Sequence, residues 1–229
     1  SILKELPKGR QPVETYAVTG KLRERAFNYV KKYLDEGRQG YIVCPMIEES
    51  DMDLQDVKTY AKKLSQGTFK HYTVGLLHGR MSGAQKEQVM NDFKEHKIDL
   101  LVSTTVVEVG VDVPNAAIMV IENADRFGLS QLHQLRGRVG RGKYKSSCIL
   151  ITDNVNEESV KRLKILGKTN DGFKISEEDL KLRGPGDFFG SRQHGLPALK
   201  IADMSQDMDI LRKAQEAAQL IRNADPKLE

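Results

Sequence analysis

The chain has 229 residues, of which 39% are hydrophobic and 30% are charged. It contains no apolar run long enough to span a membrane and no signal-peptide pattern near Ser1, so we expect a soluble, cytoplasmic protein. The formal net charge of +4 is compatible with a polyanionic partner, but many enzymes of other kinds share it, so charge alone decides little.

The first hundred residues alternate between helical patterns and short apolar runs. Residues 1–20 read as a linker that becomes a strand at 13–18. Apolar residues then recur at helical spacing from Leu22 to Tyr33, and Gly37 is placed as the stop of that helix. The next predicted elements are a strand at 41–44, a helix at 53–66, a strand within 71–78, a helix at 84–95 and a strand at 98–103.

A further strand at 116–121, a helix from about residue 130 and a strand at 147–151 complete the pattern. This alternation predicts an α/β fold, with a parallel sheet of roughly six strands and helices on both faces. Ligands of such sheets bind beyond the carboxyl ends of the strands. The polar segments 44–48, 78–80, 103–112 and 122–128 each follow a predicted strand, so we expect them to meet at one edge.

Both cysteines lie inside apolar runs. Cys44 follows Tyr-Ile-Val, and Cys148 precedes Ile-Leu-Ile. We therefore expect buried, reduced thiols rather than a disulfide or a metal pair, and we assign them no chemistry.

The pattern changes after Asp153. Apolar spacing predicts a helix around 157–167 and another around 210–221, while Gly184, Gly186, Gly190 and Gly195 are expected to break the chain between them. We therefore predict a linker and first strand at 1–20, an α/β domain at 21–155, and a small helical appendage at 156–229.

The segment Gln134–Arg141 concentrates three arginines and two glycines in eight residues. Glycine allows the backbone to approach a ligand closely, and the guanidinium groups of Arg136, Arg138 and Arg141 suit phosphate oxygens. The sequence therefore favours an anionic ligand here over a solvated basic loop.

A second polar segment, Val102–Pro114, begins as a strand and passes into a loop with hydroxyls, two carboxylates and a glycine. Hydroxyls and main-chain amides at a strand end suit phosphate binding. Asp112 could accept a hydrogen bond from a ribose hydroxyl, pair with an arginine, or form a turn ahead of Pro114, and these alternatives remain open on the sequence alone.

These two segments, taken in order, resemble motifs V and VI of superfamily-two helicases. Motif V corresponds to Glu108–Pro114 and motif VI to Gln134–Arg141. The resemblance extends to Tyr41–Pro45 as motif IV and to Leu77–Met81 as the segment after it, so it covers nearly all of 38–152. It implies the second RecA-like lobe, of P-loop-NTPase type, of a nucleic-acid motor.

In this family ATP lies between two lobes, and arginines of motif VI reach the triphosphate. The resemblance therefore implies a catalytic role for Arg138 and Arg141 and contacts to the nucleotide from Gln134, Gly110 and Asp112. Candidates for contacts to the phosphates of the nucleic acid are Arg80, Thr104 and Thr105. We interpret His78 and His133 as hydrogen-bonded scaffold histidines, because neither has a nucleophile or metal partner nearby in sequence.

The sequence lacks the glycine-rich phosphate loop and the acidic pair for magnesium that such a motor needs. Gly167-Lys-Thr169 does not qualify, because it ends a predicted helix and Arg162 stands where a glycine is required. The resemblance therefore implies that ATP and Mg²⁺ are bound mainly by a first RecA-like lobe of the same polypeptide. Alone, the chain is not expected to hydrolyse ATP.

The segment from Asp171 to Gly195, with Arg-Gly-Pro-Gly-Asp-Phe-Phe-Gly at its centre, resembles the motif that follows the second motor lobe in the RecG family of bacterial branch-migration helicases. In that family a helical hairpin and a loop push on duplex DNA. Arg162 and Arg183 match the hairpin arginines, and Gln193 matches a glutamine of the loop.

The resemblance implies branched double-stranded DNA, such as forks and Holliday junctions, as the partner, with an upstream wedge domain and a nucleoid-associated location. The alternatives are the transcription-repair coupling translocase and a nucleic-acid-binding module without enzymatic activity. An adenine-nucleotide regulatory domain is disfavoured, since no Gly-x-Gly-x-x-Gly turn follows the first strand.

Overall fold

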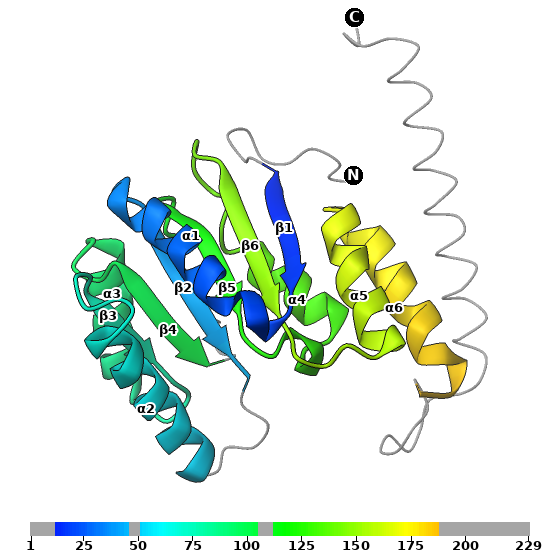
Figure 1. Ribbon diagram of the computed structural model, residues 1–229, viewed down its shortest axis with the longest axis horizontal. Coiled ribbons are helices and arrows are strands. Elements are labelled where there is room, and N and C mark those ends of the chain that lie inside the picture. Colours follow the sequence, from blue (N-terminus) through cyan, green and yellow to red (C-terminus); the bar gives the residue numbers. More distant parts are fainter. Residues whose placement is uncertain (1–11, 46–50, 105–111, 188–229) are drawn as a thin grey trace, which may run out of the picture. The chain divides into compact units, whose positions relative to one another are not determined.

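The structure is a computed structural model that describes residues 12–45, 51–104 and 112–187, without the side chains of 51–54 and 183–187. Within these ranges six strands form one parallel sheet in the order β1-β6-β5-β2-β4-β3 (Figure 1). The strands are β1 (Val13–Val18), β2 (Gln39–Cys44), β3 (Val74–Leu77), β4 (Leu100–Thr104), β5 (Ala116–Ile121) and β6 (Ser146–Ile151). The predicted α/β fold with a parallel sheet is confirmed.

Within the described ranges, four helices lie between strands in the sequence and two follow the last strand. They are α1 (Arg23–Asp35), α2 (Asp51–Gln66), α3 (Gly83–Lys94), α4 (Leu129–Arg136), α5 (Glu157–Lys168) and α6 (Gly172–Asp187), with short 3₁₀ turns η1 (Gly20–Leu22) and η2 (Ala124–Arg126). Gly37 has a φ of +79°, which confirms its predicted place just after the end of α1. None of the helices in the described ranges is long and apolar enough to cross a membrane.

One sequence expectation is corrected at α6. Gly184 and Gly186 were expected to break the chain, but the helix continues through both to Asp187. Glycine in a helix costs only about 1 kcal/mol relative to alanine. Packing of Ile175 and Leu182 against the core outweighs that cost.

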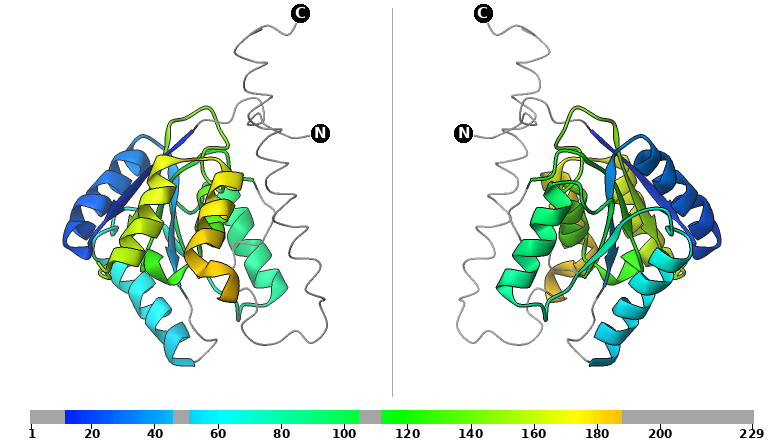
Figure 2. Two further views of the ribbon diagram at one scale, coloured as in Figure 1. Left: turned by 90° about the vertical axis from the view of Figure 1, so that its right-hand side faces the viewer. Right: turned by 90° about the vertical axis from the view of Figure 1, so that its left-hand side faces the viewer.

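Helices cover both faces of the sheet (Figure 2). Successive side chains of each strand point to opposite faces, so the sheet separates two apolar cores. In β2, Ile42 and Cys44 pack under α1 and α2, whereas Tyr41 and Val43 face the core shared with α3, α4 and α6. Both faces are buried, which explains why the strands are continuous apolar runs and not alternating ones. The predicted burial of Cys44 and Cys148 as free thiols is confirmed.

The first strand of the chain pairs with the last one. Val13 lies opposite Ser146, and Val18 opposite Ile151. Just beyond, the amide of Gly20 donates to Asp153 Oδ1 at 2.9 Å. A side chain at residue 20 would collide with this carboxylate, since an added Cβ would lie 2.3 Å from the same oxygen.

The chain divides into two compact units, residues 1–185 and 186–229, and the second lies outside the described residues beyond Asp187. In the first unit, α5 places Leu163 and Leu166 in the same core as α4. The domain boundary expected near residue 155 remains a prediction.

Candidate functional site

The arginine-rich segment begins on α4 and continues into the loop before β6. Leu129, Leu132 and Leu135 of α4 are buried in the core, and they fix this helix against the sheet. At the end of the helix, the amides of Gly137 and Arg138 donate to carbonyls of the last turn at 3.0 and 2.9 Å. Gly140 then adopts a φ of +77°, which turns the chain back toward β6 and which other residues rarely adopt.

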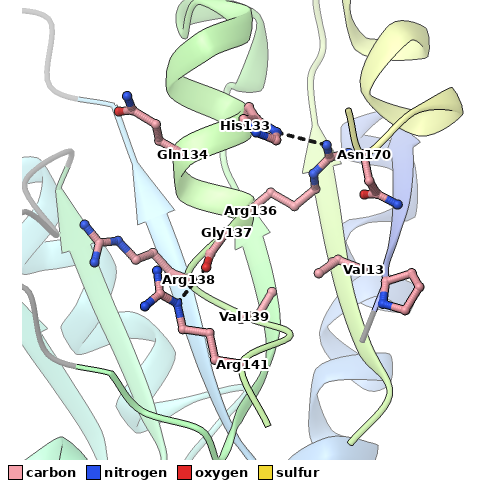
Figure 3. Close-up of a pocket in the computed structure, with 10 residues that line it drawn as sticks. Val13, His133, Gln134, Arg136, Gly137, Arg138, Val139, Arg141 and Asn170 are labelled. Atoms are coloured by element: carbon pink, nitrogen blue, oxygen red, sulfur yellow. Dashed lines mark hydrogen bonds between the residues drawn. The ribbon is translucent and has the colours of Figure 1, made fainter. Parts of the chain in front are cut away.

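A pocket opens where α4 ends (Figure 3). It is lined by Pro12, Val13, His133, Gln134, Arg136, Gly137, Arg138, Val139, Arg141 and Asn170. The side chains of Arg138 and Arg141 lie next to each other on one side of the loop, whereas Arg136 points to the opposite side, toward Asn170. The structure therefore brings three predicted nucleotide-side residues, Gln134, Arg138 and Arg141, to the same pocket.

Arg141 and Arg138 differ in how they are held. The Nε–H of Arg141 donates to the carbonyl of Gly137 at 2.8 Å, and its Nη1 pairs with the carboxylate of Asp112. The side chain of Arg138 is half-buried, and its guanidinium forms no hydrogen bond or ion pair with any described residue. Arg141 is therefore anchored in the loop, while the guanidinium of Arg138 remains available within the described part of the chain.

Asp112 thus pairs with an arginine, which is one of the alternatives that the sequence left open. It lies where the chain enters β5, near the amino ends of the strands. An added Cβ at Gly142 would lie 2.4 Å from the carbonyl oxygen of Pro114, so the loop after Arg141 packs directly on this segment. The expectation that segment 103–112 shares one edge with the other polar segments is therefore wrong for Asp112.

The charges of the two arginines reach the start of β2. Burial raises the pKa of Tyr41 to about 12, and the positive charges of Arg138 and Arg141 partly oppose that rise. The tyrosine is 1% exposed. The buried tyrosine therefore lies within electrostatic range of the arginine pair.

Arg136 does not have the role that the sequence suggested. It was grouped with the arginines expected to meet an anion, but it is 3% exposed and its guanidinium is used within the protein. It donates to the carbonyls of Leu166 and Thr169 at 2.6 and 3.0 Å, and to Thr15 Oγ1 at 3.2 Å. A signal was present in the sequence, because residue 136 follows Leu129 and Leu132 at i+7 and i+4 and so falls on their buried face.

The two histidines differ. His133 Nδ1 lies 3.2 Å from Arg136 Nη2, which confirms a hydrogen-bonded scaffold role. The Nδ1 atom of His78 is buried and has no hydrogen-bond partner within the described residues, so the expectation is wrong for this nitrogen. Burial, followed by the nearby charges of Lys58, Lys86 and Arg80, lowers the pKa of His78.

The candidates for nucleic-acid contacts lie on other elements. Arg80 is exposed just after β3, at the carboxyl end of that strand. Thr104 ends β4, is 1% exposed, and has a hydroxyl without a partner among the described residues. Arg162 on α5 donates to the carbonyl of Asp125 at 3.4 Å and to that of Phe127, so it ties α5 to the start of α4. Their roles toward nucleic acid stay predictions.

Four predicted site residues cannot be placed. Gly110, Thr105 and Gln193 lie outside the described residues. Arg183 belongs to α6, but its side chain is not described.

Sequence reasoning missed a partly buried ion pair at the carboxyl end of β5. The carboxylate of Glu122 accepts two hydrogen bonds from Arg23, at 3.1 and 3.0 Å, and one from the Tyr60 hydroxyl at 2.7 Å. Burial and this carboxylate raise the pKa of Tyr60 well above its ordinary value. The pair connects β5, α1 and α2 at the edge of the sheet opposite the arginine loop.

Comparison with known proteins places this arrangement in a family. Residues 25–143 match the family model of the helicase conserved C-terminal domain, and residues 169–229 match that of "ATP-dependent DNA helicase RecG, domain 3, C-terminal". A protein named ATP-dependent DNA helicase RecG from Bacillus subtilis is 52% identical over 96% of this chain and 33% of its own length. Its namesake from Thermotoga maritima is 46% identical over 96% of this chain and 28% of its own length.

Comparison with solved structures indicates the same family. A structure of RecG bound to a three-way DNA junction matches with a TM-score of 0.71 and 44% identity, over 90% of this chain and 26% of that one. Domain 2 of a DEAD-box helicase bound to an RNA duplex shares the fold at 18% identity, with a TM-score of 0.54, over 77% of this chain and 72% of that one. The chain spans about a third of the length of the relatives it matches. It belongs to the helicase conserved C-terminal domain family and corresponds to the C-terminal part of proteins of the RecG type.

Proposed function

We propose that the chain is the C-terminal motor lobe of an ATP-dependent double-strand DNA translocase of the RecG type, which remodels stalled forks and Holliday junctions in DNA repair and recombination. The observation that carries the proposal is the placement of Arg138 and Arg141 side by side at the end of α4, with Asp112 beside them. The relatives' name and the three-way junction bound by the related structure support it. The match of 169–229 to a RecG model favours this function over the transcription-repair coupling translocase.

The described residues fit one wall of a nucleotide triphosphate site. Arg138 offers a guanidinium without a described partner, and Arg141 is held in place by Gly137 while its Nη1 faces Asp112. A triphosphate could take over the Nη1 hydrogen bond, and Asp112 would then be free to accept one from the ribose. Bound ATP supplies the phosphoryl group, and the arginines stabilise the negative charge that develops on it during transfer.

Magnesium and the phosphate loop are assigned to the first lobe of the intact protein. Among the described residues, no group of three or more histidine, cysteine, aspartate or glutamate side chains could hold a metal ion. In this proposal, the arginines of this lobe would complete the site from the other side of the nucleotide.

DNA contacts are proposed on separate elements. Arg80 follows β3, Thr104 ends β4, and Thr105 is the next residue in the sequence. Arg162, Arg183 and Gln193 belong to the region after β6. An upstream wedge domain provides the preference for branched DNA, and the protein acts in the cytoplasm at the nucleoid. Arg162 of α5 donates to the carbonyls of Asp125 and Phe127, just before α4, so it would transmit movement between α5 and α4.

The test uses the intact protein that contains this chain. Arg141→Ala should lower DNA-stimulated ATP turnover by about a thousandfold, as expected for the loss of an arginine that stabilises phosphoryl transfer. Binding of a three-way junction should remain, because Arg141 belongs to the nucleotide side. Arg25→Ala is the matched control, since Arg25 is an exposed arginine on α1. Steady-state hydrolysis at the wild-type rate in Arg141→Ala would remove the assignment.

A further inference from the structure

Arg136 is buried beside the nucleotide-side arginines but does not share their surface. Its guanidinium makes four hydrogen bonds, to Leu166 O, Thr169 O, Thr15 Oγ1 and His133 Nδ1, at 2.6–3.2 Å. No described carboxylate pairs with it. A buried charge without a counter-ion is costly, so these bonds to neutral acceptors are what keep the guanidinium inside.

Two of the acceptors belong to the C-terminal end of α5. The last four carbonyls of a helix have no partner within the helix, and they carry the negative end of the helix dipole. α5 ends at Lys168, and Arg136 binds the carbonyls of Leu166 and Thr169 on either side of that end. A residue of α4 therefore caps α5, and Thr15 on β1 fixes the same guanidinium from the sheet.

Arg136, whose side chain caps α5, directly precedes Gly137, the residue that anchors Arg141. The carbonyl of Gly137 accepts the Nε–H of Arg141 at 2.8 Å. The path from α5 to the nucleotide side therefore consists of the Arg136 side chain, the backbone from Arg136 to the Gly137 carbonyl, and one hydrogen bond. Through these contacts, a shift of the end of α5 would reach the Gly137 carbonyl and the guanidinium of Arg141.

A second contact holds the end of α4, in this case against α6. His133, one turn before Gly137, packs against Gly172 at the start of α6, where an added Cβ would lie 2.9 Å from His133 Nε2. A side chain at residue 172 would therefore require His133 to shift. The end of α4 is thus held against both α5 and α6.

We propose that Arg136 is a positioning residue for ATP hydrolysis: by capping the C-terminal end of α5 it sets the placement of the Gly137 carbonyl and, through it, of Arg141. This inference rests on the proposed function. The guanidinium of Arg136 is engaged in hydrogen bonds within the protein, so its effect on the reaction passes through Arg141.

The test compares ATP turnover of the intact protein, with junction DNA present, for Arg136→Lys, Arg141→Lys and the double variant. Lysine keeps the charge at 136 but lacks the fork that reaches four acceptors. Because a displacement of about 1 Å at a catalytic group can cost about a hundredfold, we expect Arg136→Lys to lower kcat by roughly 10- to 100-fold, with KM for ATP unchanged. The double variant should be no slower than Arg141→Lys, since both changes remove the same interaction.

A purely structural role gives different results. The two changes would then multiply in the double variant, or Arg136→Lys would lower the melting temperature while folded protein kept its kcat. Either result overturns the inference, as does a wild-type kcat in Arg136→Lys when Arg141→Lys is impaired. If Arg141→Lys itself turns over ATP normally, the proposed function fails instead.

Two further variants complete the design. Arg25→Lys, the same substitution at an exposed position of α1, should leave kcat unchanged. If Arg136→Lys does not fold, Thr15→Val decides, because it removes one acceptor and keeps the guanidinium. It should lower kcat by a smaller factor and again not KM, and an unchanged kcat in that variant would overturn the inference.

Discussion

The Glu122–Arg23 pair provides a stability prediction whose size follows from its geometry. Glu122→Gln keeps the shape of the side chain but removes the charge that faces two hydrogen bonds from Arg23 and one from Tyr60. Breaking a fully buried pair costs about 3–5 kcal/mol. The carboxylate is 7% exposed, but the arginine is 35% exposed and can be partly rehydrated, so we expect a smaller loss of about 2–3 kcal/mol.

For a protein of this size, that loss corresponds to a decrease in melting temperature of about 4–12 °C. Thermal unfolding followed by circular dichroism, together with urea denaturation, would measure it. Glu87→Gln, at an exposed position of α3, is the control and should change the free energy of unfolding by less than about 0.5 kcal/mol. A loss in Glu122→Gln no larger than in the control would refute the view that this pair joins α1, α2 and β5.

Two further predictions concern titratable groups. Burial raises the pKa of both Cys44 and Cys148 to about 12, so neither thiol should react with a thiol reagent in the native protein, and both should react in denaturant. Fast labelling of native protein would contradict that. The pKa of His78 is lowered from 6.5 by burial, so the unfolded state takes up this proton at a higher pH than the folded state. The stabilisation from neutral His78 is complete above pH 6.5 and is lost as the pH falls below it. Denaturation measured between pH 5 and 7 should therefore show a smaller loss of stability in His78→Gln than in the unchanged protein. The same pH dependence in both proteins would disprove the assignment.

Most of the fold could be predicted from sequence because local patterns and tertiary burial agree. Strands covered on both faces must be continuous apolar runs, and helices on one side of a sheet must repeat at helical spacing, so elements such as β2 and α1 were found within a few residues. The breaks expected at Gly184 and Gly186 were wrong because the local cost of glycine is small beside the packing of Ile175 and Leu182.

The site was predicted where its residues are close in sequence. Gln134, Arg138 and Arg141 share one loop, and spacing alone brings them together. Partners far apart in sequence were not accessible in this way, since nothing local indicates that Arg23 meets Glu122 or that Arg136 reaches Thr169. Composition also could not distinguish a buried arginine from an exposed one; only its position on the apolar face of α4 could.

The pairing of β1 with β6 has a consequence for how the protein is made. Gly20 and its partner Asp153 are 133 residues apart, so a ribosome that adds about 5–20 residues per second needs about 7–27 s between them. Throughout that interval β1 has no neighbouring strand, and the half of the sheet nearest to it is incomplete. Until residues 146–151 have been synthesised, β1 must therefore be kept from pairing with the strands of other proteins.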